Sequence, residues 1–181
     1  MNEQYKVQVQ NLVDDLKAVF THAGLGGEAG EYKLLTQSFL YKFLNDKFLY
    51  EAQNVDSENT YEHLVSMSEE DYDWLLEDIG TSTAWMKPNQ FIETLHRKQN
   101  ESDFYETFEN TLNQIAIDNN DIFSVHTDEN TTVRLFNERL ITDIIPDSSK
   151  RNEVAKSIIN LLARVKFDEA IFSQGFDFFS T

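Results

Sequence analysis

The amino-acid sequence predicts an all-α fold, a single bundle of about six to eight helices around one core. Apolar residues recur with the 3.6-residue period of an amphipathic helix along nearly all of the 181 residues. No segment shows the sustained period-two alternation that is typical of a half-buried strand. The chain has only six glycines and two prolines, too few for an all-β protein rich in tight turns. Its 14 phenylalanines are enough to fill a substantial core.

The first two predicted helices cover residues 2–22 and 31–52. In the first, one stripe carries the apolar residues Val9, Leu12, Val13, Leu16, Val19 and Phe20. The second has a broader apolar face, made of Leu35, Phe39, Leu40, Phe43, Leu44 and Phe48. A face of that width indicates a central helix that packs on more than one side.

Three shorter helices are expected in the middle of the chain. Residues 68–80 begin with a Ser68–Asp71 pair that resembles a capping box and end at Gly80, a natural helix terminator. Residues 87–98 carry Pro88 at a first-turn position. Residues 102–116 place Phe104, Phe108, Leu112 and Ile115 on one face.

The remaining residues predict a short helix at 132–141 and a long one at 147–167, capped by Ser148 or Ser149. The long helix is amphipathic through Val154, Ile158, Leu161, Leu162 and Val165. After it, Phe172, Phe176, Phe178 and Phe179 crowd the last ten residues. Such exposed aromatic surface at a chain end is unusual. We therefore expect a helical domain over residues 1–166 and, over 167–181, the start of a linker toward a further domain.

The segment between the first two helices, residues 22–35, holds four of the six glycines: Gly24, Gly26, Gly27 and Gly30. Gly24, Gly26 and Ala29 formally satisfy the dinucleotide pattern G-x-G-x-x-A, which functions only at a strand-to-helix turn. Here a helix precedes it. A P-loop is excluded because Lys33 is followed by Leu34. We interpret the segment as a helix–helix connection in which glycines supply left-handed geometry and let the second helix pack closely across the first.

Other candidate chemistry is sparse. Glu93 and His96 have the spacing of di-iron ligands, but no second such pair exists, which favours a surface pair. The chain has no cysteine, so thiolate metal sites and cysteine nucleophiles are excluded. Trp74 and Trp85 are expected to be core or interface residues rather than platforms for stacking bases. We predict no catalytic, cofactor-binding or metal-binding residue.

The net charge of −17 is unevenly distributed. Residues 1–130 carry 8 basic and 25 acidic side chains, and no Lys or Arg lies between Phe48 and Met86, where ten acids do. Most of this surface repels nucleic acid. Residues 131–167 are the exception, with a cluster of seven basic residues against four acidic ones: Arg134, Arg139, Lys150, Arg151, Lys156, Arg164 and Lys166. This cluster is a candidate for contact with DNA phosphates or a partner subunit, and the alternative is an ordinary solvated helix face.

The glycine-rich turn and the helix after it resemble the N-terminal region of the DNA adenine methyltransferase (modification, M) subunit of type I restriction–modification systems. In that family a short loop precedes a helix with the pattern E-Y-K, a lysine nine positions later and an aspartate four beyond that. Glu31, Tyr32, Lys33, Lys42 and Asp46 occupy the matching positions. The stretches "AWMKPNQFIETL", "FYETFENTLNQIA", "RLFNERL" and "IINLLARVKF" are similar to later parts of the family's helical domain, in the same order.

The resemblance implies a non-catalytic role for these residues. The family's methyltransferases need an Asn/Asp-Pro-Pro-Phe/Tyr motif and a glycine-rich loop for S-adenosylmethionine. Pro88 and Pro146 stand alone and Gly175 has no glycine partner, so both motifs are absent, and with them the Rossmann-like catalytic domain. The full-length protein is expected to use S-adenosylmethionine. Its implied partners are a specificity subunit, a second modification subunit, a restriction subunit and, through the complex, double-stranded DNA.

Two other functions stay open. An acidic DNA mimic that occupies the groove of a DNA-binding enzyme fits the charge of −17 but not the basic cluster. A helical enzyme lacks support because no paired catalytic residues are visible. No signal peptide and no apolar run of the roughly 18 residues needed to span a bilayer is present, so we expect a cytoplasmic protein with no membrane partner.

Overall fold

The computed structural model describes residues 2–120, 136 and 139–173. All regular secondary structure in these ranges is helical, which confirms the predicted all-α class. The elements are α1 (Asn2–His22), α2 (Ala29–Val55), α3 (Tyr61–Ser66), α4 (Glu69–Ile79), the 3₁₀ turn η1 (Pro88–Gln90), α5 (Ile92–Arg97), α6 (Phe104–Asp118), α8 (Leu140–Ile144), α9 (Ser148–Arg164) and α10 (Glu169–Phe172). None of the helices in the described ranges combines the length and the apolar character needed to cross a bilayer.

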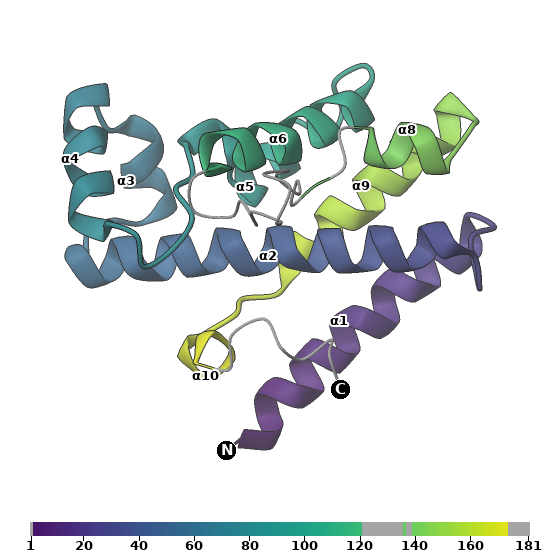
Figure 1. Ribbon diagram of the computed structural model, residues 1–181, viewed down its shortest axis with the longest axis horizontal. Coiled ribbons are helices and arrows are strands. Elements are labelled where there is room, and N and C mark those ends of the chain that lie inside the picture. Colours follow the sequence, from purple (N-terminus) through teal and green to yellow (C-terminus); the bar gives the residue numbers. More distant parts are fainter. Residues whose placement is uncertain (1, 121–135, 137–138, 174–181) are drawn as a thin grey trace, which may run out of the picture.

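The long helix α2 forms the spine of the molecule, with α1 on one side and α5 and α6 on the other (Figure 1). It contacts α1, α4, α8 and α10 along its 27 residues. Its buried side chains extend from Leu34 to Ala52 and include Phe39, Phe43 and Phe48. The prediction of a central helix that packs on more than one side is confirmed.

A second layer of the core is built on α9, which packs against α1, α5, α6 and α8. The predicted stripe on α6 is confirmed, since Phe104, Phe108, Leu112 and Ile115 are fully buried. Phe108 meets Tyr41 of α2 edge to face, with 6.0 Å between ring centroids. These aromatic contacts bury large areas at low conformational cost and join the two layers.

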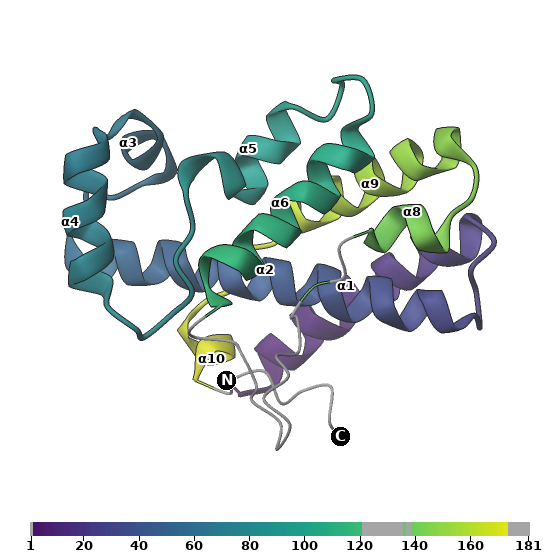
Figure 2. The same ribbon diagram turned by 45° about the horizontal axis from the view of Figure 1, so that its top comes forward.

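The helices α3 and α4 form a separate end of the molecule beside the C-terminal half of α2 (Figures 1 and 2). The predicted limits of α4 are correct. Ser68 Oγ accepts a hydrogen bond from the Asp71 amide at 3.2 Å, and Gly80 ends the helix with a φ of +67°. Tyr72 anchors α4, since its ring stacks on Phe48 and its hydroxyl donates to the Met86 carbonyl.

The glycine-rich segment connects two helices, as predicted, but one glycine acts differently from the expectation. Gly24 and Gly27 have φ values of +86° and +79°, the left-handed geometry that glycine supplies. Gly26 approaches Thr21 of α1 closely, whereas Gly30 makes its close approach to α8. A Cβ at position 30 would lie 2.7 Å from Ile144 Cγ2.

The cap of α9 also differs from the prediction. Asp147, rather than Ser148 or Ser149, is the N-cap, and its carboxylate accepts from the Ser149 amide at 2.9 Å. An aspartate is among the best N-caps, and it lies one residue before the two serines that the sequence suggested.

The packed core continues past the boundary expected at residue 166. Phe167 is buried against Phe39, and Ile171 of α10 is fully buried. Most of the helix predicted at 132–141 and the phenylalanines at 176, 178 and 179 lie outside the described residues, although Phe136 is fully buried and α8 begins at Leu140. Whether a further domain follows stays a prediction.

Candidate functional site

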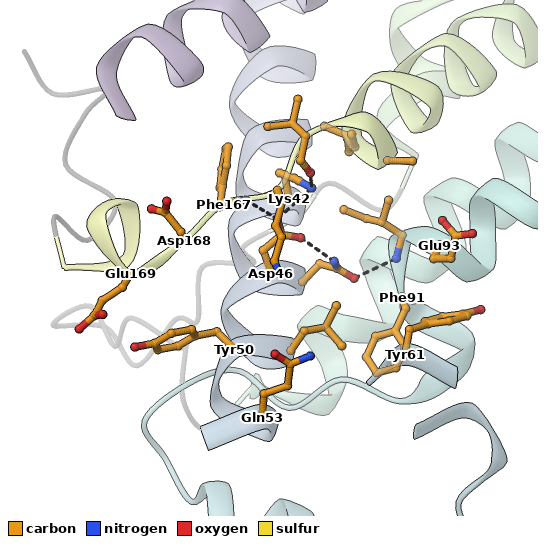
Figure 3. A pocket seen from close by; sticks show the side chains of 17 residues that line it. Lys42, Asp46, Tyr50, Gln53, Tyr61, Phe91, Glu93, Phe167, Asp168 and Glu169 are labelled. Carbon is orange, nitrogen blue, oxygen red and sulfur yellow. Dashed lines mark hydrogen bonds and ion pairs between the residues drawn. The ribbon is translucent and has the colours of Figure 1, made fainter. Parts of the chain in front are cut away.

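A groove of about 540 Å³ runs along one face of α2 (Figure 3). The α2 residues that line it recur with helical spacing: Lys42, Asn45, Asp46, Leu49, Tyr50 and Gln53. Tyr61 and the start of α5, from Phe91 to Glu93, line it on one side, and residues 162, 163 and 165–169 line it on the other. Its size is within the range of ligand sites, and its lining mixes aromatic rings with carboxylates.

A buried ion pair lies at one end of the groove. Lys42 Nζ is 2.9 Å from Asp46 Oδ2, and both side chains are less than a tenth exposed. The ammonium also donates to the Val165 carbonyl, and the carboxylate accepts from the Phe167 amide at 2.8 Å. One turn of α2 therefore binds the backbone of a segment more than 120 positions further along the chain.

Asn45 extends this polar cluster toward α5. Its side-chain amide donates to Asp46 Oδ1 at 2.8 Å and its oxygen accepts from the Ile92 amide at 2.9 Å. The Ile92 amide is at the first turn of α5, where backbone donors have no partner within the helix. Lys42, Asn45 and Asp46 thus join α2 to both sides of the groove.

The electrostatics of the pair follow from burial. Burial lowers the pKa of the Lys42 ammonium below its usual value, while the attraction of Asp46 and its hydrogen bond oppose that shift. The Phe167 ring, 5.6 Å from Lys42 Nζ, adds a cation–π contact. Removing one member of a buried pair typically costs about 3–5 kcal/mol, because it leaves an uncompensated charge.

The basic cluster expected from the sequence is dispersed. Arg134 lies outside the described residues. Arg139 is exposed beside Asp143, and Lys150 lines a smaller groove between α1 and α9 together with Glu153. Lys156 is half-buried on α9, whereas Arg164 and Lys166 are exposed at its far end. Contact of these residues with DNA or a partner stays a prediction.

Arg151 is engaged inside the fold. Its guanidinium donates to the carbonyls of Ile145 and Pro146, at 2.6 and 3.0 Å, and lies over the Tyr105 ring. A cation at these carbonyls satisfies acceptors that the end of α8 leaves open. Arg151 is therefore a structural residue of the α8–α9 connection.

A phosphate site at the glycine-rich segment would need free backbone N–H donors, but one of these donors is bound to a carboxylate of the protein. Glu31 Oε2 accepts the hydrogen bond of the Gly27 amide at 2.7 Å. This places a negative charge of the protein itself at the start of α2, where the helix dipole favours an anion. The observed contact supports the interpretation of a connection rather than a phosphate cradle.

The remaining residues singled out in the sequence are the Glu93–His96 pair and the two tryptophans, Trp74 and Trp85. Glu93 accepts from Arg97 at 3.1 Å, and His96 lies 4.0 Å from the same carboxylate. Across the residues that the structure describes, no three His, Asp or Glu side chains are grouped as metal ligands. Trp85 donates its indole N–H to the Gly80 carbonyl at 2.7 Å, whereas Trp74 is 61% exposed on α4.

Searches of protein-family models, of curated proteins and of solved structures found no match to this chain.

The sequence pattern alone did not identify the polar cluster of Lys42, Asn45 and Asp46 as a site. Lys42 and Asp46 stood out only through the resemblance, and Asn45 did not stand out at all. The Lys–Asp pair four residues apart was visible in the sequence, but such a pair normally lies on a solvated helix face and did not indicate burial.

Proposed function

We propose that this chain is the non-catalytic N-terminal helical domain of the adenine-N6 DNA methyltransferase subunit of a type I restriction–modification system. In this role it supports subunit assembly and closure around DNA. One observation carries the proposal: of the five positions that match the family pattern, three form the contacts that organise α2.

Each of these three residues has a defined task. Glu31 fixes the glycine turn through the Gly27 amide. Lys42 and Asp46 form the buried pair that holds residues 165–167. The three residues thus have structural roles that fit the spacing of the family pattern on α2, and the proposal rests on this agreement.

The other two matching residues lie on the surface. Tyr32 is 61% exposed and Lys33 is exposed, so the packing of this domain does not require either side chain. Exposed tyrosines are frequent anchors of protein interfaces. We assign Tyr32 and Lys33 to contact with a partner subunit, either the specificity subunit or the second modification subunit.

Contact with DNA would come from exposed cations that lie outside residues 48–86, where ten acids and no Lys or Arg occur. Arg164 and Lys166 are exposed and can neutralise phosphates, and Lys150 is exposed as well, beside the Asp147 carboxylate. The full-length subunit would supply the S-adenosylmethionine site and the catalytic motif.

The decisive experiment is to sequence the genomic DNA that follows the codon for Thr181. An open frame that encodes an Asn/Asp-Pro-Pro-Phe/Tyr motif and a glycine-rich loop supports the proposal, and a frame that closes without them overturns it. Calorimetry gives an independent check on the chain itself, since a micromolar S-adenosylmethionine site on these 181 residues would contradict a non-catalytic role.

A second candidate, an acidic DNA mimic, is favoured by α4. All six carboxylates of this helix are exposed: Glu69, Glu70, Asp71, Asp73, Glu77 and Asp78. A mimic should capture a DNA-binding enzyme in a pull-down and release it on addition of duplex DNA or salt. Capture of a specificity subunit that persists in the presence of DNA favours the first proposal instead.

A further inference from the structure

The segment from Val165 to Phe172 lies across α2 as a strap. Its backbone is held by Lys42 and Asp46, and its rings contact α2 as well. Phe167 packs on Phe39 with 5.3 Å between centroids, and Phe172 packs on Tyr50 at 5.2 Å. On the α1 side, the strap accepts one exposed hydrogen bond at 2.7 Å, from Gln8 to the Lys166 carbonyl, and Ile171 is buried.

The ion pair beneath the strap belongs to a single helix. Because Lys42 and Asp46 are four residues apart on α2, the pair stays together when the strap departs. Departure then hydrates an intact pair and leaves no lone charge in a dry site. The main cost of opening is therefore the loss of the hydrogen bonds from Lys42, Gln8 and the Phe167 amide, of the ring contacts and of the burial of Ile171.

When the strap covers α2, the charges of Lys42 and Asp46 are subject to a stricter requirement. Under the strap both side chains are almost fully buried, so their charges must balance. A lone buried ammonium or a lone buried carboxylate is strongly unfavourable, whereas a neutral pair of similar shape is tolerated. Loss of one charge should drive the strap open, and loss of both should let it close again.

We propose that residues 165–172 form a strap that opens and closes as a unit over α2, and that the charge balance of Lys42 and Asp46 determines its position. The strap residues Val165, Phe167 and Glu169 line one side of the groove along α2. Opening therefore widens this groove and exposes Leu49 and Tyr50. The inference concerns the isolated chain and holds whether or not the proposed function is correct.

Hydrogen exchange measured by mass spectrometry on the complete chain tests this. The variants are Lys42→Met, Asp46→Asn and the double variant, with peptides that cover residues 163–173 as the readout. Asn has one oxygen, which can accept from the Phe167 amide, so Asp46→Asn removes the charge and keeps that acceptor. The contact with the Asn45 side-chain amide is lost in this variant. We expect each single variant to exchange in the strap at least about tenfold faster than wild type, and the double variant to return to within about threefold.

Lys47→Met is the matched control. Lys47 also lies on α2, but its ammonium donates to the Ser82 carbonyl at 2.9 Å, away from the strap. Its loss should leave exchange at residues 163–173 unchanged. Peptides from α6 report global unfolding. A penalty on the closed state also brings it closer to the unfolded state, so α6 exchange accelerates in the single variants, but its opening free energy should stay above that of the strap in every variant.

Two outcomes overturn the proposal. In the first, the double variant exchanges at least as fast as the faster single variant, which means that the two side chains act as independent anchors. In the second, the strap and α6 amides exchange with the same opening free energy in the single variants, so that the strap opens only by global unfolding.

Wild-type protein provides a test that needs no variant. In low concentrations of urea, exchange of the strap amides should depend on urea less steeply than exchange of α6, because strap opening exposes less surface than global unfolding. An identical urea dependence in the two regions shows that the strap opens only by global unfolding, and the proposal then fails.

Discussion

The side chain of Asn119 pairs with both backbone groups of Trp85. Its oxygen accepts from the Trp85 amide at 2.7 Å, and its nitrogen donates to the Trp85 carbonyl at 2.8 Å. The same nitrogen donates to the Ile115 carbonyl, and Asn119 is only 2% exposed. This residue ends α6 and fixes the loop between α4 and η1 against it.

Replacement of Asn119 by alanine should lower the free energy of unfolding by about 1–3 kcal/mol for each backbone group of Trp85 left buried without a partner. Urea denaturation followed by circular dichroism measures the loss. Asn110→Ala, at an exposed position of α6, is the control and should change stability by less than about 0.5 kcal/mol. Equal effects of the two substitutions would contradict the role assigned to Asn119.

The contact between Gly30 and Ile144 predicts an unusual response to alanine. Alanine normally stabilises a helix relative to glycine, but here its methyl group would lie 2.7 Å from Ile144 Cγ2. We expect Gly30→Ala to destabilise the protein by about 1–3 kcal/mol, because overpacking outweighs helix propensity. Ile144→Ala removes the clashing methyl, so the double variant should lose less than the sum of the single variants in thermal melts. Strict additivity would show that the two positions do not meet.

Two buried tyrosines should make the protein sensitive to alkali. Burial raises the pKa of Tyr41 and Tyr72 above the ordinary value of 10.0. The unfolded chain therefore releases these protons near pH 10 while the folded chain keeps them. Because the folded state then binds more protons, stability falls as pH rises through about 10.

Tyr72→Phe isolates this effect. Wild type should be more stable than the variant at neutral pH, because the hydroxyl donates to the Met86 carbonyl. That advantage should shrink above about pH 10, where the unfolded wild-type tyrosine ionises. Urea midpoints of both proteins, measured between about pH 8 and pH 11, give the comparison. A difference that does not vary with pH would show that Tyr72 ionises as readily in the folded protein as in the unfolded chain.

The cap of α9 predicts the opposite pH dependence. Hydrogen bonds from the Ser149 hydroxyl and amide lower the pKa of Asp147 from its ordinary value of 3.8. The stabilisation is present above that value and is lost as pH falls through the lower pKa of the folded state. Asp147→Ala should therefore melt at a lower temperature than wild type at neutral pH and converge with it in acid. Asp147→Asn, which keeps the capping oxygen, should lie closer to wild type at neutral pH.

The sequence predicted the parts of the fold that depend on local repetition. The stripes on α1 and α6 and the ends of α4 at Ser68 and Gly80 follow from helical period and capping chemistry, which are encoded within a few residues. The one-residue error at the cap of α9 reflects the similar propensities of Asp147 and the serines that follow it.

Contacts between residues that lie far apart in the sequence could not be predicted from it. A Lys–Asp pair four residues apart normally lies on a solvated helix face, and nothing local indicates that residues 165–167 cover Lys42 and Asp46. Arg151 was placed among candidate surface cations for the same reason, since its acceptors at Ile145 and Pro146 depend on how α8 meets α9. The close approach at Gly30 required knowledge that Ile144 lies opposite.

The acidic end of the molecule has a consequence for the solution around it. Ten carboxylates occur between Phe48 and Met86 without a Lys or Arg, and Arg97 reaches in from α5 to bind Glu62 at 2.7 Å and to cover the Tyr61 ring. Dissolved cations must balance most of the remaining charge, and their effect extends over about 10 Å at 0.1 M salt. Salt screens the mutual repulsion of these carboxylates, so we expect the attachment of α3 and α4 to the rest of the protein to strengthen as ionic strength rises.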